Sequence, residues 1–528
     1  MKPITAADVK ARLSANAEFA LLDVREDGQF GEGHLLHAVP LPYSVLEREV
    51  RRLVPRADVP VYLVDDADGT AEKAASRLEA MGYTDVRVLD GGHAAAEAEG
   101  FTIFKGVNVP SKTLGELAEE IGHTPSIDAE EMNRMLKDGD DFILLDGRTP
   151  KEFENMSIPG GRTCPNAELP YRLPMLVTNP KTKVIVNCAG RTRSLIGAQS
   201  LRNFGFDNPI YALKNGTQGW RLAGFELDHG RTPTPLPDVR GAAFDEAKAR
   251  ARAFMAEKGI PGVDARTASG WAAEGGRTLF VFDVRTAEEH AAHHPAGAVH
   301  APGGQLTQTT DKWVGVRGAR IVLCDDSGVR AASTAYWLRA MGHDAYVLTD
   351  DASAPLPGFA APESGLQPVP ESLEEISASD LAADTTAAAI VDLRASADYR
   401  DAHIDGARWS IRPRLDALGL GADDDVVLCA ADKAVAEMAA MDLRDTGVST
   451  IRFLAGNAED WRAAGLDVVS TPDAPTDAER IDFLFFVHDR HTGNAEASRE
   501  YLNWELGLIG QLKDWELKLF PIHDGHGH

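Results

Sequence analysis

LLDGRT, residues 144–149, is one of four related stretches in the chain, and this repetition decides the fold. The other copies, LLDVRE (21–26), VFDVRT (281–286) and IVDLRA (390–395), share an apolar pair followed by Asp-x-Arg. Each copy is typical of a short buried strand that ends in a turn. A helical stretch precedes each copy, and a second apolar strand, a helix, a turn and a third apolar strand follow. Because strands alternate with helices, we predict an α/β fold: four repeated units, each a mostly parallel sheet with helices on both faces, plus a C-terminal helical tail.

Shifts in composition separate these units. Proline- and glycine-rich linkers lie at 229–241, 352–372 and 470–479, whereas the first junction, near 104–112, is less marked. The predicted domains are residues 1–103 (unit 1), 104–230 (unit 2), 231–361 (unit 3), 362–472 (unit 4) and 473–528 (the tail).

The tail carries apolar side chains at helical spacing: Tyr501, Trp504, Leu508, Leu512 and Trp515. This pattern predicts an amphipathic helix that packs on one of the units or on a second subunit. A homodimer contact therefore stays open.

Composition and cysteine usage narrow the class of protein. The chain has 528 residues and a formal net charge of −27, which disfavours nucleic acid and anionic membrane surfaces as partners. We expect a cytoplasmic protein, because no long apolar run or signal peptide is evident. The four cysteines, Cys164, Cys188, Cys324 and Cys429, form no CxxC pair and are expected to be reduced thiols. No pattern indicates a metal or cofactor site, and the terminal HDGHGH (523–528) is expected to be a solvated tail.

One cysteine lies in an unusual loop. VIVNCAGRTRSLIGAQSL, residues 184–201, takes a β-branched strand into Cys188 and then through a basic loop into a helix. A loop between a strand and a helix N-terminus directs backbone N–H groups inward and favours a thiolate or a bound anion. Arg191 and Arg193 add positive charge, which should lower the pKa of the Cys188 thiol. The residues predicted to bind the substrate are Ala189, Gly190, Arg191, Thr192 and Ser194.

The register of the repeats singles out this cysteine. The step along the sequence that leads from Asp146 to Cys188 leads from Asp23 to Asp65, and from Asp283 to Asp325. In unit 4 the strand alignment places Ala430 at this position, after Cys429. Only unit 2 therefore carries a thiol in register, and the other units are predicted to be non-catalytic.

With these motifs the chain resembles the rhodanese sulfurtransferases, and most closely the tandem bacterial thiosulfate sulfurtransferases. In that family a cysteine opens a six-residue loop, here residues 188–193, accepts sulfane sulfur as a persulfide and passes it to cyanide or a thiol. The resemblance implies four rhodanese-like domains, no cofactor, and catalysis by Cys188 with Arg193. We expect Arg193 to close the loop at the helix, and Arg191 to lie at its crest beside the entering substrate.

The length and composition of the loop bear on the substrate. Phosphatase-like relatives use a loop one residue longer, and relatives that use mercaptopyruvate resemble CG[ST]GV[TA], so thiosulfate is the favoured donor. A second class of function stays open: a sulfur carrier or thiol-redox scaffold that relays persulfide from Cys188 to a protein partner. The acidic loops of units 1 and 3 should repel thiosulfate.

Overall fold

A computed structural model describes residues 2–350, 356, 359, 370–384, 388–488 and 494–524. Most of the predicted linker at 352–372, the proposed boundary between units 3 and 4, and the last four residues of HDGHGH lie outside the described residues.

Each unit contains one main sheet, and the main sheets of units 2, 3 and 4 have the same strand order. Units 1 and 4 each add a two-stranded antiparallel sheet. In unit 2 the order is β8-β12-β11-β9-β10, and every pair in it is parallel. The strands of unit 2 are β8 (Ser126–Ile127), β9 (Phe142–Asp146), β10 (Arg162–Thr163), β11 (Lys183–Asn187) and β12 (Ile210–Leu213). Its helices are α6 (Val109–Gly122), α7 (Ala129–Asp138), α8 (Pro150–Asn155), α9 (Leu169–Leu176), α10 (Thr192–Asn203) and α11 (Gly216–Leu222).

Unit 1 follows the same plan, with one strand added from unit 3. Its main strands are β1 (Lys2–Ile4), β2 (Phe19–Asp23), β4 (Val39–Pro40), β5 (Val61–Val64) and β6 (Val86–Leu89). Its helices are α1 (Ala6–Ser14), α2 (Asp27–Glu32), α3 (Leu46–Leu53), α4 (Thr70–Ala80) and α5 (Gly92–Ala98), and β3 (His34–Leu35) pairs with β7 (Ile103–Phe104). Strand β16 (Val316–Arg317) of unit 3 pairs antiparallel with β2, so a hydrogen-bonded sheet joins the two units.

Units 3 and 4 complete the series. The other strands of unit 3 are β13 (Gly262–Val263), β14 (Leu279–Asp283), β15 (Val299–His300), β17 (Arg320–Cys324) and β18 (Asp344–Leu348); its helices are α12 (Ala242–Lys258), α13 (Ala265–Glu274), α14 (Ala287–Ala292), α15 (Gly303–Gln308) and α16 (Val329–Ala340). The strands of unit 4 are β19 (Glu374–Ile376), β20 (Ala389–Asp392), β21 (His403–Ile404), β22 (Arg408–Trp409), β23 (Asp425–Cys429), β24 (Thr450–Leu454) and β25 (Val468–Val469); its helices are α17 (Ala378–Ala383), α18 (Ser396–Asp401), α19 (Lys433–Asp445) and α20 (Ala458–Ala463).

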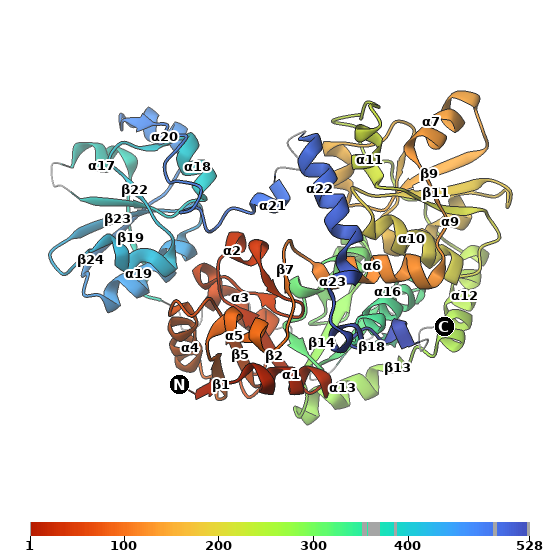
Figure 1. The fold of residues 1–528 in the computed structure, drawn as a ribbon, viewed down its shortest axis with the longest axis horizontal. Helices are drawn as coiled ribbons and strands as arrows, with labels where there is room; N and C mark the ends of the chain where they lie inside the picture. Colours follow the sequence, from red (N-terminus) through yellow and green to blue (C-terminus); the bar gives the residue numbers. More distant parts are fainter. Residues whose placement is uncertain are drawn as a thin grey trace.

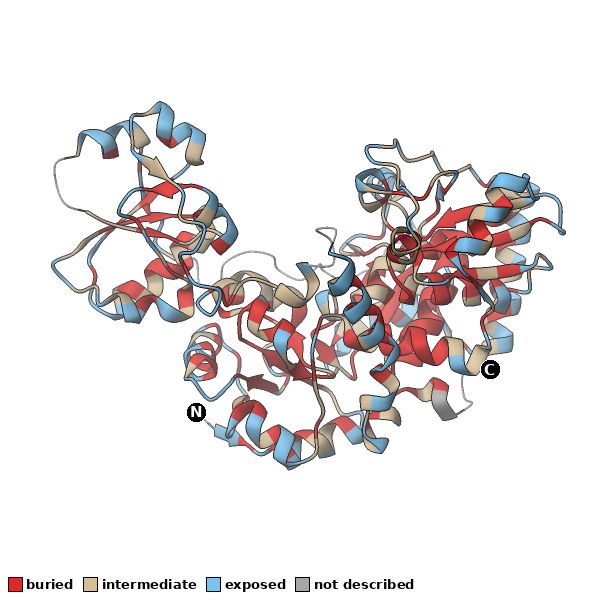
Figure 2. Cartoon of the chain, turned by 45° about the horizontal axis from the view of Figure 1, so that its top comes forward, coloured by how far each residue is buried: buried red, intermediate tan, exposed pale blue. Residues whose placement is uncertain are grey.

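Units 1, 2 and 3 share one continuous hydrophobic core. A single cluster of buried residues includes Leu78 of α4, Leu114 of α6, Ile196 of α10 and Leu338 of α16. Units 1, 2 and 3, with the tail, form the larger lobe of the molecule, and Figure 2 shows this buried region running through it. The three units are therefore packed together as one body, which holds the loops at the carboxyl ends of their strands in place.

Unit 4 stands apart, on the left in Figure 1, and has hydrophobic clusters of its own. Its contact with unit 1 is a buried charge network. Arg412 donates to Glu47 at 2.7 Å, and its Nε donates to Asp442 at 2.9 Å. Arg77 of unit 1 also donates to Asp442, at 2.6 Å.

The Asp-x-Arg motif has the same role in every unit. Each arginine donates to the aspartate that ends the strand through its backbone N–H, its Nε and one terminal nitrogen, and the shortest N–O distance in each pair is 2.6 or 2.7 Å. The motif therefore fixes the turn after the first long strand.

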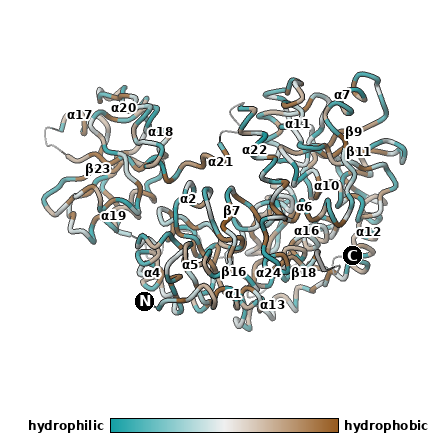
Figure 3. The backbone as a smooth tube through the Cα atoms, in the orientation of Figure 1, coloured by the Kyte–Doolittle hydropathy of each residue, from teal (hydrophilic) through white to brown (hydrophobic). Residues whose placement is uncertain are grey.

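The tail returns from unit 4 to the larger lobe through a segment around α21 (Phe485–His488) that is hydrophobic in Figure 3. It then forms α22 (Ala495–Leu506), α23 (Leu508–Gln511) and α24 (Asp514–Leu517). Tyr501 and Leu508 are buried within this chain, which confirms packing on the units. The prediction of one amphipathic helix was wrong, because the helix ends at Leu506 and Trp515 packs separately against Phe101 of unit 1.

Candidate active site

The loop that contains Cys188 connects β11 to α10 at the carboxyl edge of the unit 2 sheet. Cys188 follows the last residue of β11, and its side chain is almost fully buried, with 2% of it exposed. The hydroxyl of Ser194, in the first turn of α10, donates to Cys188 Sγ at 3.1 Å. The sulfur therefore lies at the N-terminal end of a helix, where partial positive charge and N–H groups favour a negative charge.

A second loop closes over the backbone of Cys188. The N–H of Thr217 donates to the Cys188 carbonyl at 2.8 Å, and the N–H of Gln218 donates to the Ala189 carbonyl at 3.0 Å. Gly216, which starts α11, has φ +51°, and a Cβ there would lie 2.1 Å from the Cys188 carbonyl oxygen. A side chain at Gly216 would therefore force the two loops apart.

Arg193 lies in the first turn of α10, where the sequence placed it, and it is held by a carboxylate. Its two terminal nitrogens donate to Glu152 of α8 at 2.8 and 2.7 Å. Burial alone would raise the pKa of Glu152, but Arg193 and the hydrogen bonds from Thr149 hold this pKa at about 2. Burial opposes the charge of Arg193, yet Glu152 and the nearby Cys188 sulfur raise its pKa. Arg193 thus stays charged beside the thiol.

Arg191 differs from the expectation. The sequence placed it at the crest of the loop beside an entering substrate, but its side chain is 4% exposed and points to α6. Its Nε and one terminal nitrogen each donate to Glu116 at 2.8 Å, and a further, very short hydrogen bond joins it to Glu119. The predicted placement was wrong because the carboxylates that hold Arg191 lie on α6, about 70 residues earlier in the chain, and the local sequence of the loop does not indicate that contact.

The carboxylates around Arg191 influence one another. Burial raises the pKa of Glu116 to about 7; Arg191 opposes this rise, and the negative charges of Glu505 and Glu119 add to it. The pKa of Arg191 is raised by Glu116 and its neighbours, although burial works in the other direction. The charge of Arg191 is therefore largely matched before any substrate arrives.

Glu505 is a residue of this site that the sequence did not reveal. It lies on α22 of the tail, is buried, and accepts a hydrogen bond from the Thr192 hydroxyl at 2.6 Å. Its other oxygen has no hydrogen-bond partner among the described residues and lies 3.2 Å from where a Cβ of Gly190 would be. The tail therefore covers the loop, and its helical pattern alone gave no sign of which surface it would cover.

A close contact between helices positions α6 beside the loop. Gly115 of α6 would, with a Cβ, approach the Thr192 Cα at 3.0 Å. A side chain at Gly115 would press on Thr192, so glycine at this position allows α6 to bring its carboxylates close to Arg191.

The loops of units 1 and 3 contain a carboxylate where unit 2 has sulfur. Asp65 accepts hydrogen bonds from the N–H groups of Ala67 and Ala71, both at 2.9 Å. Asp325 accepts from the N–H groups of Ser327 at 3.4 Å and Arg330 at 2.8 Å. These loops are therefore occupied by their own side chains.

The remaining cysteines are unsuited to nucleophilic chemistry. Cys164, Cys324 and Cys429 are all buried, and burial raises the pKa of each thiol. A buried neutral thiol is a poor nucleophile.

Comparison with known proteins assigns the family. The Rhodanese-like domain model matches residues 5–99, 128–223 and 264–354, which together make up more than half of the chain, and the chain therefore belongs to the rhodanese family. Unit 4 lies outside these matches but shares the strand order of units 2 and 3.

Individual relatives agree with this assignment. The crystal structure of a thiosulfate sulfurtransferase from Pseudomonas aeruginosa is 40% identical with a TM-score of 0.88, covering 98% of this chain and 99% of that one. A sulfurtransferase from Allochromatium vinosum is 28% identical over 102 residues, which are 19% of this chain and 92% of that protein. The uncharacterized protein YqhL of Bacillus subtilis is 34% identical over 92 residues, 17% of this chain and 69% of that protein. The protein is a sulfurtransferase with tandem rhodanese-like domains.

Within the described part of the chain, no helix is both long and apolar enough to cross a membrane. No group of His, Cys, Asp or Glu side chains among the same residues is arranged to hold a metal ion.

Proposed function

We propose that the protein transfers sulfane sulfur from thiosulfate through a persulfide on Cys188 to cyanide or a small thiol. The Cys188 thiolate attacks the outer sulfur of thiosulfate, the S–S bond of thiosulfate breaks, and sulfite leaves with the electron pair. The acceptor then attacks the terminal sulfur of the persulfide, takes it up, and releases the Cys188 thiolate. One cysteine is sufficient for both steps.

The main support for this proposal comes from the equivalent loops of units 1 and 3, which are occupied by their own aspartate side chains. Asp65 and Asp325 show that this loop binds a negatively charged side chain through backbone N–H groups. By register, the N–H groups of Gly190, Arg193 and Ser194 take the same positions around Cys188. They would stabilise the charge on the terminal sulfur of a persulfide, and Arg193 adds a fixed positive charge.

The ion pairs of Arg191 change the contacts that we propose for the thiosulfate dianion. Because Glu116 and Glu119 already hold Arg191, we assign the donor contact to the loop N–H groups and Arg193, with Thr192 and Ser194 as hydroxyl donors. In this proposal Arg191 shapes the loop and does not touch the donor. The near-complete burial of Cys188 favours a small acceptor over a bulky protein thiol.

Mass spectrometry after exposure to thiosulfate tests the proposal. We expect a mass gain of one sulfur atom, located on Cys188 and lost on addition of cyanide. The Cys188→Ser variant should show neither this gain nor turnover, whereas the matched Cys324→Ser and Cys429→Ser variants should retain most of both. Substantial turnover in Cys188→Ser would overturn the assignment. A Cys188 persulfide that passes its sulfur to a protein thiol faster than to cyanide would favour the relay function instead.

A further inference from the structure

A basic pocket lies where unit 1, unit 3 and the tail meet, away from the Cys188 loop. Its volume is about 430 Å³, and its wall includes residues of α1, the end of α16 and the chain after α24. Its cationic side chains are Lys258, Arg277, Arg317, Arg339 and Lys518, and Asp344 is the carboxylate among its lining residues. This concentration of positive charge stands out in a chain with a net charge of −27.

Arg317 is the most unusual of these side chains. Burial lowers its pKa to about 10, and no carboxylate offsets that effect. Its Nη1 lies 3.3 Å from His37 Nδ1, and its Nε has no hydrogen-bond partner among the described residues. The guanidinium therefore remains charged at neutral pH with hydrogen-bonding capacity unused, which is costly for a group removed from water.

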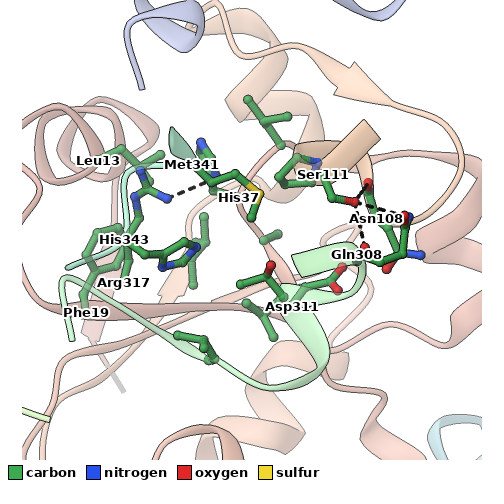
Figure 4. Close-up of a pocket in the computed structure, with 18 residues that line it drawn as sticks. Leu13, Phe19, His37, Asn108, Ser111, Gln308, Asp311, Arg317, Met341 and His343 are labelled. Carbon is green, nitrogen blue, oxygen red and sulfur yellow. Dashed lines mark hydrogen bonds between the residues drawn. The ribbon is translucent and has the colours of Figure 1, made fainter. Parts of the chain in front are cut away.

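Arg317 and His343 separate this pocket from a smaller cavity. Figure 4 shows that cavity, with Arg317 linked to His37 and with His343 beside them. Burial lowers the pKa of His343 to about 3, and the charge of Arg317 adds to this effect. Burial and the charge of Arg317 also hold the pKa of His37 well below its ordinary value. Both histidines are therefore neutral and do not add to the positive charge, and Arg317 is the charged group that lines both cavities.

The acidic groups nearby leave a surplus of positive charge. Asp344 is shared between Arg277, 2.9 Å away, and Arg339, 3.7 Å away. Lys258 pairs with its sequence neighbour Glu257 at 2.9 Å. Arg317 and Lys518 have no ion pair among the described residues, so the pocket offers two uncompensated cations that face one cavity.

We propose that this pocket is a second binding site, for a small organic anion that carries at least two negative charges on phosphate or carboxylate groups. Arginine and lysine together provide the hydrogen-bond donors that such groups need. The remaining wall includes Ile260, Tyr336 and Ile522, which suit an apolar body, and the volume matches a small ligand. None of the Cys188 loop residues lines the pocket, so the site is distinct from the sulfur-transfer site.

The position of the pocket indicates what its ligand would do. The ligand would contact Arg317 of unit 3 and Lys518 of the tail in one cavity, and α1 of unit 1 forms another part of the wall. A ligand that binds only the assembled state stabilises it in proportion to occupancy, so it would hold the tail on the larger lobe.

Isothermal titration calorimetry of the full-length protein with inorganic pyrophosphate and, separately, citrate tests this proposal in 0.1 M chloride. We expect one site per chain for at least one probe, with binding about tenfold weaker in the Lys518→Gln/Arg339→Gln double variant. The Lys137→Gln/Lys181→Gln variant, with the same charge change on the exposed surface of unit 2, should bind as the wild type does. Tight binding of pyrophosphate alone would identify a phosphate ligand, and tight binding of citrate alone a carboxylate ligand.

Two controls keep the outcome interpretable. Cys188→Ser should bind the probe unchanged, because the pocket is remote from the loop; loss of binding there would place the probe in the sulfur-transfer site and overturn the proposal. Circular dichroism checks that the double variant is folded. Absence of binding up to about 10 mM probe, or undiminished binding in a folded double variant, would also overturn it.

Discussion

Replacing Arg191 by methionine tests whether this arginine shapes the loop or binds the donor. The change leaves Glu116 buried without its cation, and removing one partner of a buried ion pair costs about 3–5 kcal/mol. Protonation of Glu116 limits that cost. The folded-state pKa of Glu116 is already about 7 and must rise further without Arg191. The free energy of unfolding of the variant should therefore fall, relative to wild type, by about 1.4 kcal/mol for each pH unit above 7, until the full cost of the unpaired carboxylate is reached.

The assay has a stability arm and a chemical arm. Hydrogen exchange of peptides from α6 and α10 should show lower protection in Arg191→Met, with a difference that grows from pH 7 to pH 9. Glu116→Met added to Arg191→Met should recover protection and remove the pH dependence, because the unpaired carboxylate is gone. Sulfur loading should fall by similar factors for thiosulfate and for an uncharged persulfide donor.

The opposite pattern would refute this reasoning. If Arg191→Met kept full protection and lost loading from thiosulfate alone, the guanidinium would have to leave Glu116 and contact the donor. Arg191 would then be a substrate-binding residue, as the sequence suggested.

Three further predictions concern the charged groups of the site. Because the folded-state pKa of Glu116 lies above its ordinary value of 4.5, its contribution to stability should be fully present below pH 4.5 and lost as pH rises through 7; Glu116→Gln should abolish this slope in urea unfolding followed between pH 5 and 8. Glu505→Gln keeps an acceptor for Thr192 and removes a negative charge near Glu116, so NMR or exchange titration should show the Glu116 pKa shifted down; an unchanged midpoint would mean that Glu505 is not charged there. The pKa of Glu152 is lowered, so the stability that it contributes is present above pH 4.5 and lost as pH falls towards 2. Arg193→Gln should remove this loss of stability in acid and reduce sulfur loading from both donors. Loading at the wild-type rate in Arg193→Gln would exclude Arg193 from the chemistry.

The sequence predicted the local features of this molecule well. The aspartate and arginine of each Asp-x-Arg motif lie two positions apart in the sequence. The conformation of the Cys188 loop is fixed by the strand and the helix that directly flank it. Both features therefore follow from neighbouring residues. The shared strand order follows from the repetition of the motif. These features depend on short-range patterns, which a single sequence displays.

The partners of the loop could not be predicted in the same way. Glu116 lies 75 residues before Arg191, and Glu505 lies 313 residues after Thr192. The periodicity of the sequence does not relate such distant positions, because the packing of α6 and α22 on the loop is determined by the tertiary structure. Gly115 within an otherwise helical stretch was the available hint of a close contact on α6.

The carboxylate-filled loop of unit 3 has a consequence for the evolution and engineering of the chain. Arg330 pairs with Glu289 as Arg193 pairs with Glu152, and its N–H groups already converge on one anionic side chain. The arginine and the backbone donors around the reactive position are thus already in place, whereas Val329 and Ala331 stand where unit 2 has the hydroxyls of Thr192 and Ser194. Asp325→Cys would place a sulfur among those donors, so the carboxylate of a non-catalytic domain can be regarded as a stand-in for the charged sulfur of the persulfide intermediate.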